Sequence, residues 1–125
     1  TEEQPFFYLY ISIVLYIFSS IFSVWPMLHN PFFEGMVRIQ EDKNHSVVNT
    51  GPYKIVRHPG YIGMLLGSIS LPLALGSVLA FIPVLIMGLL IFIRTYYEDT
   101  TLKRELSGYS EYCKKVRYRL IPYIW

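Results

Sequence analysis

Charge is scarce in this sequence, and the places where it is missing are informative. Of the 125 residues, 16% are charged, whereas 53% are apolar and 17% are aromatic. Soluble domains carry about 25% charged residues. Two stretches, residues 5–28 and 59–93, contain no Asp, Glu, Lys or Arg. The composition therefore argues against an ordinary small soluble domain and indicates an integral membrane protein.

Cysteine is scarce as well. Cys113 is the single cysteine, so no internal disulfide can form and no second thiol is available for a metal site. The formal net charge of +2 is too small to indicate nucleic acid as a partner. The chain starts at Thr1, and no basic segment precedes its first apolar stretch, which is not the pattern of a signal peptide. We therefore expect a fragment of a longer protein, without a bound metal.

The first uncharged stretch is long enough to be a transmembrane helix. About twenty apolar residues cross about 30 Å of hydrocarbon, and residues 5–28 meet this requirement. Trp25 and Pro26 are expected to close the helix. Four hydroxyl groups interrupt the apolar residues and favour packing against a neighbouring helix. They belong to Ser12, Ser19, Ser20 and Ser23.

The second uncharged stretch is too long for one span. It is interrupted by three residues that disfavour helix, Pro72, Gly76 and Pro83. We therefore predict a helical hairpin over residues 60–104, with a short arm at about 60–74 and a return arm at about 77–104. Pro83 is expected to kink the return arm, which membrane helices tolerate.

Small residues on the short arm recur at spacings of three and four. This spacing places them in one stripe along a helix, where the backbone of another helix can approach closely. They are Gly60, Gly63, Gly67, Ser70 and Ala74. A neighbouring helix is therefore expected on this face.

Basic residues all fall on one side of this arrangement. The first span changes sides and the hairpin returns to where it started, so every Lys and Arg lies in the loop 29–59, at the end of the hairpin or in the tail 105–125, whereas Glu2 and Glu3 lie opposite. Because cytoplasmic segments collect positive charge, the loop and the C-terminus are assigned to the cytosol. The predicted fold is all-α, a single multi-pass domain over 1–125: an integral-membrane helical bundle of one span, a hairpin and a C-terminal interfacial helix.

The hairpin also brings distant polar residues together. Its two ends meet at one interface, so Arg57 and His58 are expected near Arg94 and Glu98. Ionisable groups at the edge of the hydrocarbon are costly and mark functional sites. Pro59 favours a helix start directly after His58, where backbone N–H groups attract an anion. The alternative is that both arginines only extend toward lipid phosphates.

Three motifs then follow one another in a familiar order. They read NHSVVNTGPYKIVRHPGYIG at 44–63, RTYYEDTTL at 94–102 and GYSEYCKKVRYRLIPYIW at 108–125. Together they resemble the isoprenylcysteine carboxyl methyltransferase and phospholipid methyltransferase family of integral-membrane enzymes. The resemblance covers about residues 37–125 and includes the spacing between the Arg-His-Pro and acidic motifs. Each motif alone is weak, but the set in this order is specific.

The resemblance implies S-adenosylmethionine as the methyl donor, and it implies which residues bind it. These are Gln40, His45, Ser46, Val47, Val48, Tyr53, His58, Pro59, Gly60, Tyr61 and Glu98. It also implies that Arg94 lies near the methyl acceptor, which makes Arg94 the catalytic candidate. Asp99 stands where the family has a second glutamate, and its role is left open.

These residue types suit the chemistry of the donor. Tyr53 or Tyr61 can face the sulfonium through a cation–π contact. Backbone N–H groups near His58 can receive the carboxylate of the donor, and Glu98 can accept hydrogen bonds from its ammonium or its ribose hydroxyls. The alternative for both tyrosines is anchoring at the membrane interface.

The expected partners are the lipid bilayer and a lipophilic or lipidated acceptor. A prenylcysteine carboxylate would be oriented by the guanidinium of Arg94, and a phospholipid amine is the other candidate acceptor. The tail after Leu102 alternates basic and aromatic residues, which favours an interfacial helix on anionic lipid. A lid over the cofactor is the compatible alternative.

Two other functions are consistent with parts of the pattern. One is an NADPH-dependent membrane enzyme related to sterol reductases, although Met64 stands where that group is expected to carry an acid. The other is a non-enzymatic membrane subunit whose polar cluster only holds helices together. Titration with S-adenosylhomocysteine and with NADPH separates these alternatives.

Overall fold

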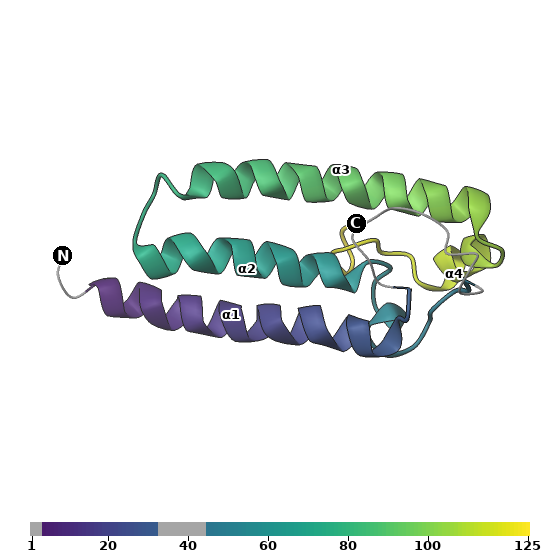
Figure 1. Cartoon of the computed structure of the whole chain (residues 1–125), viewed down its shortest axis with the longest axis horizontal. Coiled ribbons are helices and arrows are strands. Elements are labelled where there is room, and N and C mark those ends of the chain that lie inside the picture. The colour runs from purple at the N-terminus through teal and green to yellow at the C-terminus, as the bar shows by residue number, and fades with distance from the viewer. Residues whose placement is uncertain (1–3, 33–44) are drawn as a thin grey trace.

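The computed structural model describes residues 4–32 and 45–125, and every regular element in these ranges is a helix (Figure 1). The prediction of an all-α membrane bundle is therefore confirmed. In chain order the elements are α1 (Gln4–His29), the short 3-10 helix η2 (Gly51–Lys54), α2 (Pro59–Leu75), α3 (Phe81–Glu105) and α4 (Tyr109–Lys115). Figure 1 shows α1, α2 and α3 side by side along the long axis, with α4 at one end.

Two of these helices are long and apolar enough to cross a membrane, judged by length and composition. They are Phe6–His29 of α1 and Phe81–Glu105 of α3. Pro26 lies inside α1, which continues to His29, so the prediction that Trp25 and Pro26 close the helix was wrong. At about 1.5 Å per residue, the 17 residues of α2 fall short of about 30 Å of hydrocarbon, as expected for the short arm.

Helix α1 is the neighbour that packs on the small-residue stripe of α2. Ser12 Oγ donates to the carbonyl of Ser70 at 2.9 Å, and Ser19 Oγ donates to the carbonyl of Gly63 at 2.7 Å. A Cβ atom at Gly63 would lie 2.8 Å from the backbone nitrogen of Ser23. The backbones therefore approach so closely that only glycine fits at this position, and the expected helix contact is confirmed.

The hairpin turn is built by glycine. Gly76 caps α2 with φ 64°, a left-handed conformation that glycine adopts without a steric penalty. Helix α3 begins at Phe81, so Pro83 is its third residue. In the first turn of a helix no intrahelical hydrogen bond is lost to proline, and the kink predicted at Pro83 therefore has no cause.

The C-terminal tail folds back onto the loop that precedes α2. Its helix covers only Tyr109–Lys115, shorter than the interfacial helix expected over 105–125. The backbone N–H of Arg57 donates to the carbonyl of Tyr118, and that of His58 donates to the carbonyl of Arg119, both at 2.9 Å. Tyr109 is buried in the protein, which fits the lid interpretation of the tail better than the interfacial one.

Candidate functional site

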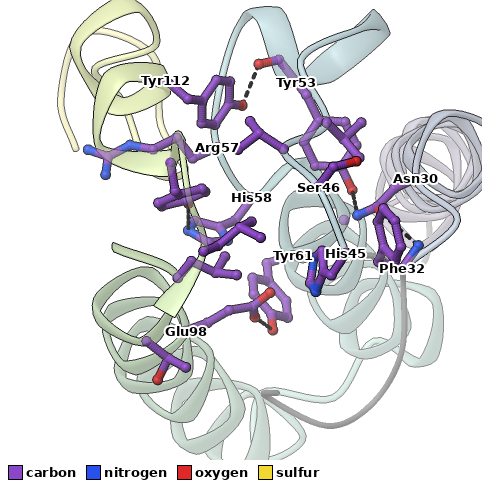
Figure 2. Close-up of a pocket in the computed structure, with 17 residues that line it drawn as sticks. Asn30, Phe32, His45, Ser46, Tyr53, Arg57, His58, Tyr61, Glu98 and Tyr112 are labelled. Carbon is purple, nitrogen blue, oxygen red and sulfur yellow. Dashed lines mark hydrogen bonds between the residues drawn. The ribbon is translucent and has the colours of Figure 1, made fainter. Parts of the chain in front are cut away.

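A cavity opens where the loop before α2, the start of α2, the end of α3 and the helix α4 converge (Figure 2). It encloses about 830 Å³ of space, including the part that is open to solvent. Most of the residues predicted to bind a cofactor line it: His45, Ser46, Val47, Val48, Tyr53, His58, Gly60, Tyr61 and Glu98. Segments about forty residues apart in the chain thus face one space, as the hairpin predicts.

The remaining predicted residues lie elsewhere. Pro59 is the buried first residue of α2 and starts the helix behind the cavity wall. Arg94 does not line the cavity, but its Nε donates to the hydroxyl of Tyr61, which does. Gln40 lies outside the described residues, so its predicted role stays a prediction.

The hydroxyl of Tyr61 joins α2 to α3. It donates a short hydrogen bond to Glu98 Oε2 and accepts one from Arg94 Nε at 2.7 Å (Figure 2 shows the bond to Glu98). The guanidinium carbon of Arg94 also lies 5.8 Å from the centre of the Tyr61 ring. Arg94 and Glu98 are one turn apart on α3, so one tyrosine reaches both from the neighbouring helix.

Asp99 follows Glu98 on α3, about a third of a turn further around the helix, and it is 1% exposed. Its carboxylate accepts hydrogen bonds from Arg57 Nη1 at 2.6 Å, His58 Nε2 at 3.1 Å, the Tyr109 hydroxyl at 2.8 Å and Arg119 Nε at 3.3 Å. These donors come from three segments, the loop before α2, helix α4 and the tail. A buried charge needs such partners, and Asp99 in turn fixes Arg57 and His58, which line the cavity.

Tyrosines of the loop and α4 form the wall opposite Glu98. The Tyr112 hydroxyl donates to the carbonyl of Tyr53 at 2.5 Å, and the Tyr53 hydroxyl accepts from Asn30 Nδ2 at 2.9 Å (Figure 2). Burial raises the pKa of the Tyr53 hydroxyl to about 12 and also raises the pKa of Tyr112. Burial, together with the negative charge of Asp99, raises the pKa of Tyr109. All three hydroxyls therefore stay protonated at neutral pH.

Several lining residues were not predicted. Thr101 and Leu102 follow Glu98 by three and four residues, so helical spacing alone places them on its face. Tyr109 and Tyr112 are likewise three apart and lie within a motif that the sequence displays. Others carry no local signal: Asn30, Phe32 and Leu106. Arg57 also lines the cavity, as expected from its place beside His58 in the polar cluster. The ring of Phe32 stacks on that of His45, with centroids 4.3 Å apart.

The lining residues fit a sulfonium cofactor with an amino-acid end. Glu98 supplies a negative charge, and the tyrosine and histidine rings supply aromatic faces. Arg57 has a buried Nε without a hydrogen-bond partner in the described part of the chain, which is a donor suited to a carboxylate. Within residues 4–32 and 45–125 there is no group of three or more His, Cys, Asp or Glu placed to hold a metal ion.

Comparisons with known proteins bear on this site. The isoprenylcysteine carboxyl methyltransferase (ICMT) family matches residues 11–104. A probable protein-S-isoprenylcysteine O-methyltransferase of Oryza sativa subsp. indica is 30% identical over 94 residues, which are 74% of this chain and 49% of that protein. A Delta(14)-sterol reductase of Mus musculus is 32% identical over 99 residues, which are 77% of this chain and 24% of that protein.

A third relative is protein-S-isoprenylcysteine O-methyltransferase B of Arabidopsis thaliana. It is 30% identical over 86 residues, which are 67% of this chain and 44% of that protein. The chain thus spans about a quarter to a half of the length of these relatives. No solved structure matches it. The family match covers most of the chain, including both arms of the hairpin and the acidic pair on α3, and the chain is a membrane protein that belongs to the isoprenylcysteine carboxyl methyltransferase family.

Proposed function

We propose that this chain forms the catalytic part of an S-adenosylmethionine-dependent methyltransferase that methylates the carboxylate of a prenylated cysteine at the membrane. The observation that carries this proposal is the cavity between the loop before α2 and Glu98 of α3, beside an arginine at the edge of the apolar helix. The names of two relatives support this acceptor class.

The cofactor, when bound, supplies a methyl group on a sulfonium. Glu98 would bind its ammonium or its ribose hydroxyls, and Arg57 Nε would bind its carboxylate. Rings at the cavity wall, those of Tyr53 and His45 among them, would cover its positive and aromatic parts. The loop residues Ser46, Val47 and Val48 would close the side toward α4. Methyl transfer needs alignment more than acid–base chemistry, so a rigid cavity of this kind suits it.

Arg94 would hold the acceptor. It is the first charged residue after the uncharged stretch 59–93, so an acceptor that enters from the hydrocarbon meets it before the cavity. A carboxylate is ionised near neutral pH and matches the planar guanidinium. A phospholipid amine is the other acceptor class, but it would have to be deprotonated first. The carboxylate therefore fits Arg94 better.

The proposed arrangement in the membrane follows from charge. Residues 5–28 and the uncharged part of the hairpin, up to about residue 93, would lie in the bilayer, so that the protein is multi-pass. The end of the return arm, with Glu98, would emerge from it. The loop 29–59 and the tail 105–125, which carry most of the Lys and Arg, would face the cytosol. A water-soluble cofactor would then enter from the cytosol while a lipidated acceptor approaches from the bilayer.

A reductase that uses NADPH is the second candidate, because a sterol reductase is among the relatives. The charges in the cavity count against it. Glu98 is negative, and Arg57, whose Nη1 donates to Asp99 at 2.6 Å, has its Nε left for a single carboxylate and not for several phosphates. A dinucleotide with several phosphates is normally bound by arginine or lysine side chains that face it, whereas a sulfonium and an ammonium suit a site with a carboxylate.

Titration of the purified chain in detergent with S-adenosylhomocysteine and with NADPH tests the proposal. The chain should bind the first ligand, and Glu98→Gln should weaken that binding more than tenfold, since a charge-assisted hydrogen bond contributes about 1.5–3 kcal/mol. Glu105→Gln is the matched control, because Glu105 is exposed on the same helix and does not line the cavity. Binding of NADPH alone would support the reductase, and binding of neither ligand would support a non-enzymatic subunit.

A further inference from the structure

The Tyr61 hydroxyl is hydrogen-bonded to two charged side chains of α3. One is Glu98, proposed to bind the cofactor, and the other is Arg94, proposed to bind the acceptor. Glu98 lines the cavity, whereas Arg94 does not. The hydroxyl accepts from Arg94 Nε at 2.7 Å and donates to Glu98 Oε2, so both of its bonding directions are used. A side chain on α2 therefore connects two residues of α3 that have different surroundings.

Arg94 is half-buried and lies where the apolar part of α3 ends. The apolar part of α3 precedes it, and the neighbouring Ile93 is 44% exposed on the outside of the protein. Glu98 lies one turn further along, toward the polar end of the helix. Along α3 the apolar part of the helix is thus followed by Arg94 and then by Glu98 at the cavity wall. Tyr61 bonds to both of these residues.

A hydroxyl in this position couples the conformations of the Glu98 and Arg94 side chains. Donating to a carboxylate polarises the O–H group and makes its oxygen a better acceptor, so the bonds to Glu98 and Arg94 strengthen each other. A ligand that fixes the Glu98 carboxylate also fixes the hydroxyl, and with it the rotamer of Arg94. The Arg94 side chain is then already ordered when the acceptor binds, so acceptor binding carries less of the entropic cost of ordering it.

We propose that Tyr61 is a positioning residue through which cofactor binding at Glu98 prepares Arg94 for an anionic, lipophilic acceptor. This inference rests on the proposed function, and it adds a coupling between the two binding sites. The cofactor and the acceptor then bind with positive coupling, and the coupling is reciprocal by thermodynamic linkage. Tyr61 acts through its hydroxyl, so the ring alone is not sufficient.

The test measures the affinity for N-acetyl-S-farnesylcysteine with and without saturating S-adenosylhomocysteine, which carries no methyl group to transfer. In the unmodified chain the affinity should rise about fivefold or more, the lower end of common coupling free energies. Tyr61→Phe removes only the hydroxyl and should bring the ratio to about one. Tyr97→Phe is the matched control, since Tyr97 is 62% exposed on α3 next to Glu98, and it should keep the full ratio.

A second variant covers the case in which Tyr61→Phe fails to fold. Arg94→Lys keeps the charge but removes the Nε donor, and it should lower the ratio in the same way. An unchanged ratio in a folded Tyr61→Phe protein that still binds S-adenosylhomocysteine would overturn the inference and leave the proposed function intact. A ratio near one in the unmodified chain would do the same. Failure of the unmodified chain to bind either probe would overturn the proposed function itself.

Discussion

Two regions of this protein hold helices together in opposite ways. Where α1 meets α2, small residues let the backbones touch, and the polar groups involved are serine hydroxyls that donate to carbonyls of the facing helix. At the other end, around Asp99, long charged and aromatic side chains from three segments converge on one buried carboxylate. Small side chains allow close backbone contact in the first region, whereas long side chains form the contacts of the second.

This difference in packing distinguishes the structural contact between α1 and α2 from the candidate site around Asp99. Backbone contact in the first region leaves no space for a ligand and tolerates little change in volume. The second region is a shell of hydrogen bonds whose inner members, Arg57 and His58, line a cavity. Because a partly satisfied buried network costs more than an apolar core, this shell should be the most sensitive part of the molecule.

Asp99→Asn is expected to have the largest effect. It leaves the buried charge of Arg57 without its counter-charge, and breaking one side of a buried ion pair costs about 3–5 kcal/mol. The midpoint of thermal unfolding in detergent should fall sharply, and the tail should become sensitive to protease. Glu111→Gln, which breaks an exposed pair with Lys114, should change little. Equal effects of the two variants would show that the Asp99 cluster does not hold the tail.

Asp99→Glu sharpens the same point, since it keeps the charge and adds one methylene. Asp99 is fully packed, and an extra methylene in a packed site costs about 1–3 kcal/mol. The variant should therefore be less stable than the unmodified chain but more stable than Asp99→Asn. The same argument explains why this position carries an aspartate where the resemblance expects a glutamate.

Gly63→Ala tests the first region and is expected to come next in size. Its new methyl group would lie 2.8 Å from the backbone nitrogen of Ser23, so α1 must move away at a cost of about 1–3 kcal/mol. Gly88→Ala adds the same methyl group on α3, 3.8 Å from the nearest side-chain atom, and should be neutral or slightly stabilising. Thermal unfolding of both variants in detergent gives the difference, and similar midpoints would contradict close contact between α1 and α2.

Alkaline pH should destabilise the region around the site more than the contact between α1 and α2, without any mutation. The folded state holds the protons of Tyr53 and Tyr109 more tightly than the unfolded state, because their pKa is raised from 10.0. The stability they contribute is complete below pH 10 and is lost as the pH rises toward about 12 for Tyr53. Each pH unit costs up to about 1.4 kcal/mol per group. Tyrosinate absorbance and helix content should show the site end opening while α1 and α2 remain paired.

The sequence predicts these two regions unequally, for physical reasons. The spacing of Gly63 and Gly67 is a local, periodic signal, and it predicted the stripe on which α1 packs. The approach of His58 to α3 followed from the hairpin, since both ends of a U-turn must meet. Spacing alone does not tell which of Glu98 and Asp99 faces the cavity, because both are acids and neighbouring helical residues differ by about a third of a turn. The family resemblance selected Glu98, which lines the cavity.

The position of the C-terminal tail could not be predicted from its local sequence pattern either. Alternating basic and aromatic residues are typical of a helix on lipid, yet Tyr109 and Tyr112 are buried in this protein. Their burial depends on partners far away in the chain, the carboxylate of Asp99 and the carbonyl of Tyr53. Long-range hydrogen bonds of this kind leave no periodic trace in a single sequence.

Ser19→Ala should give the smallest effect. Its hydroxyl donates to the carbonyl of Gly63 at 2.7 Å, and hydrogen bonds between membrane helices contribute about 0.6 kcal/mol on average. Ser20→Ala is the control, because Ser20 Oγ bonds only one turn back, to the carbonyl of Tyr16 in its own helix. If close packing holds α1 on α2, Ser19→Ala should destabilise the protein far less than Gly63→Ala. A loss as large as that of Gly63→Ala would mean that the hydroxyl, and not backbone contact, joins the two helices.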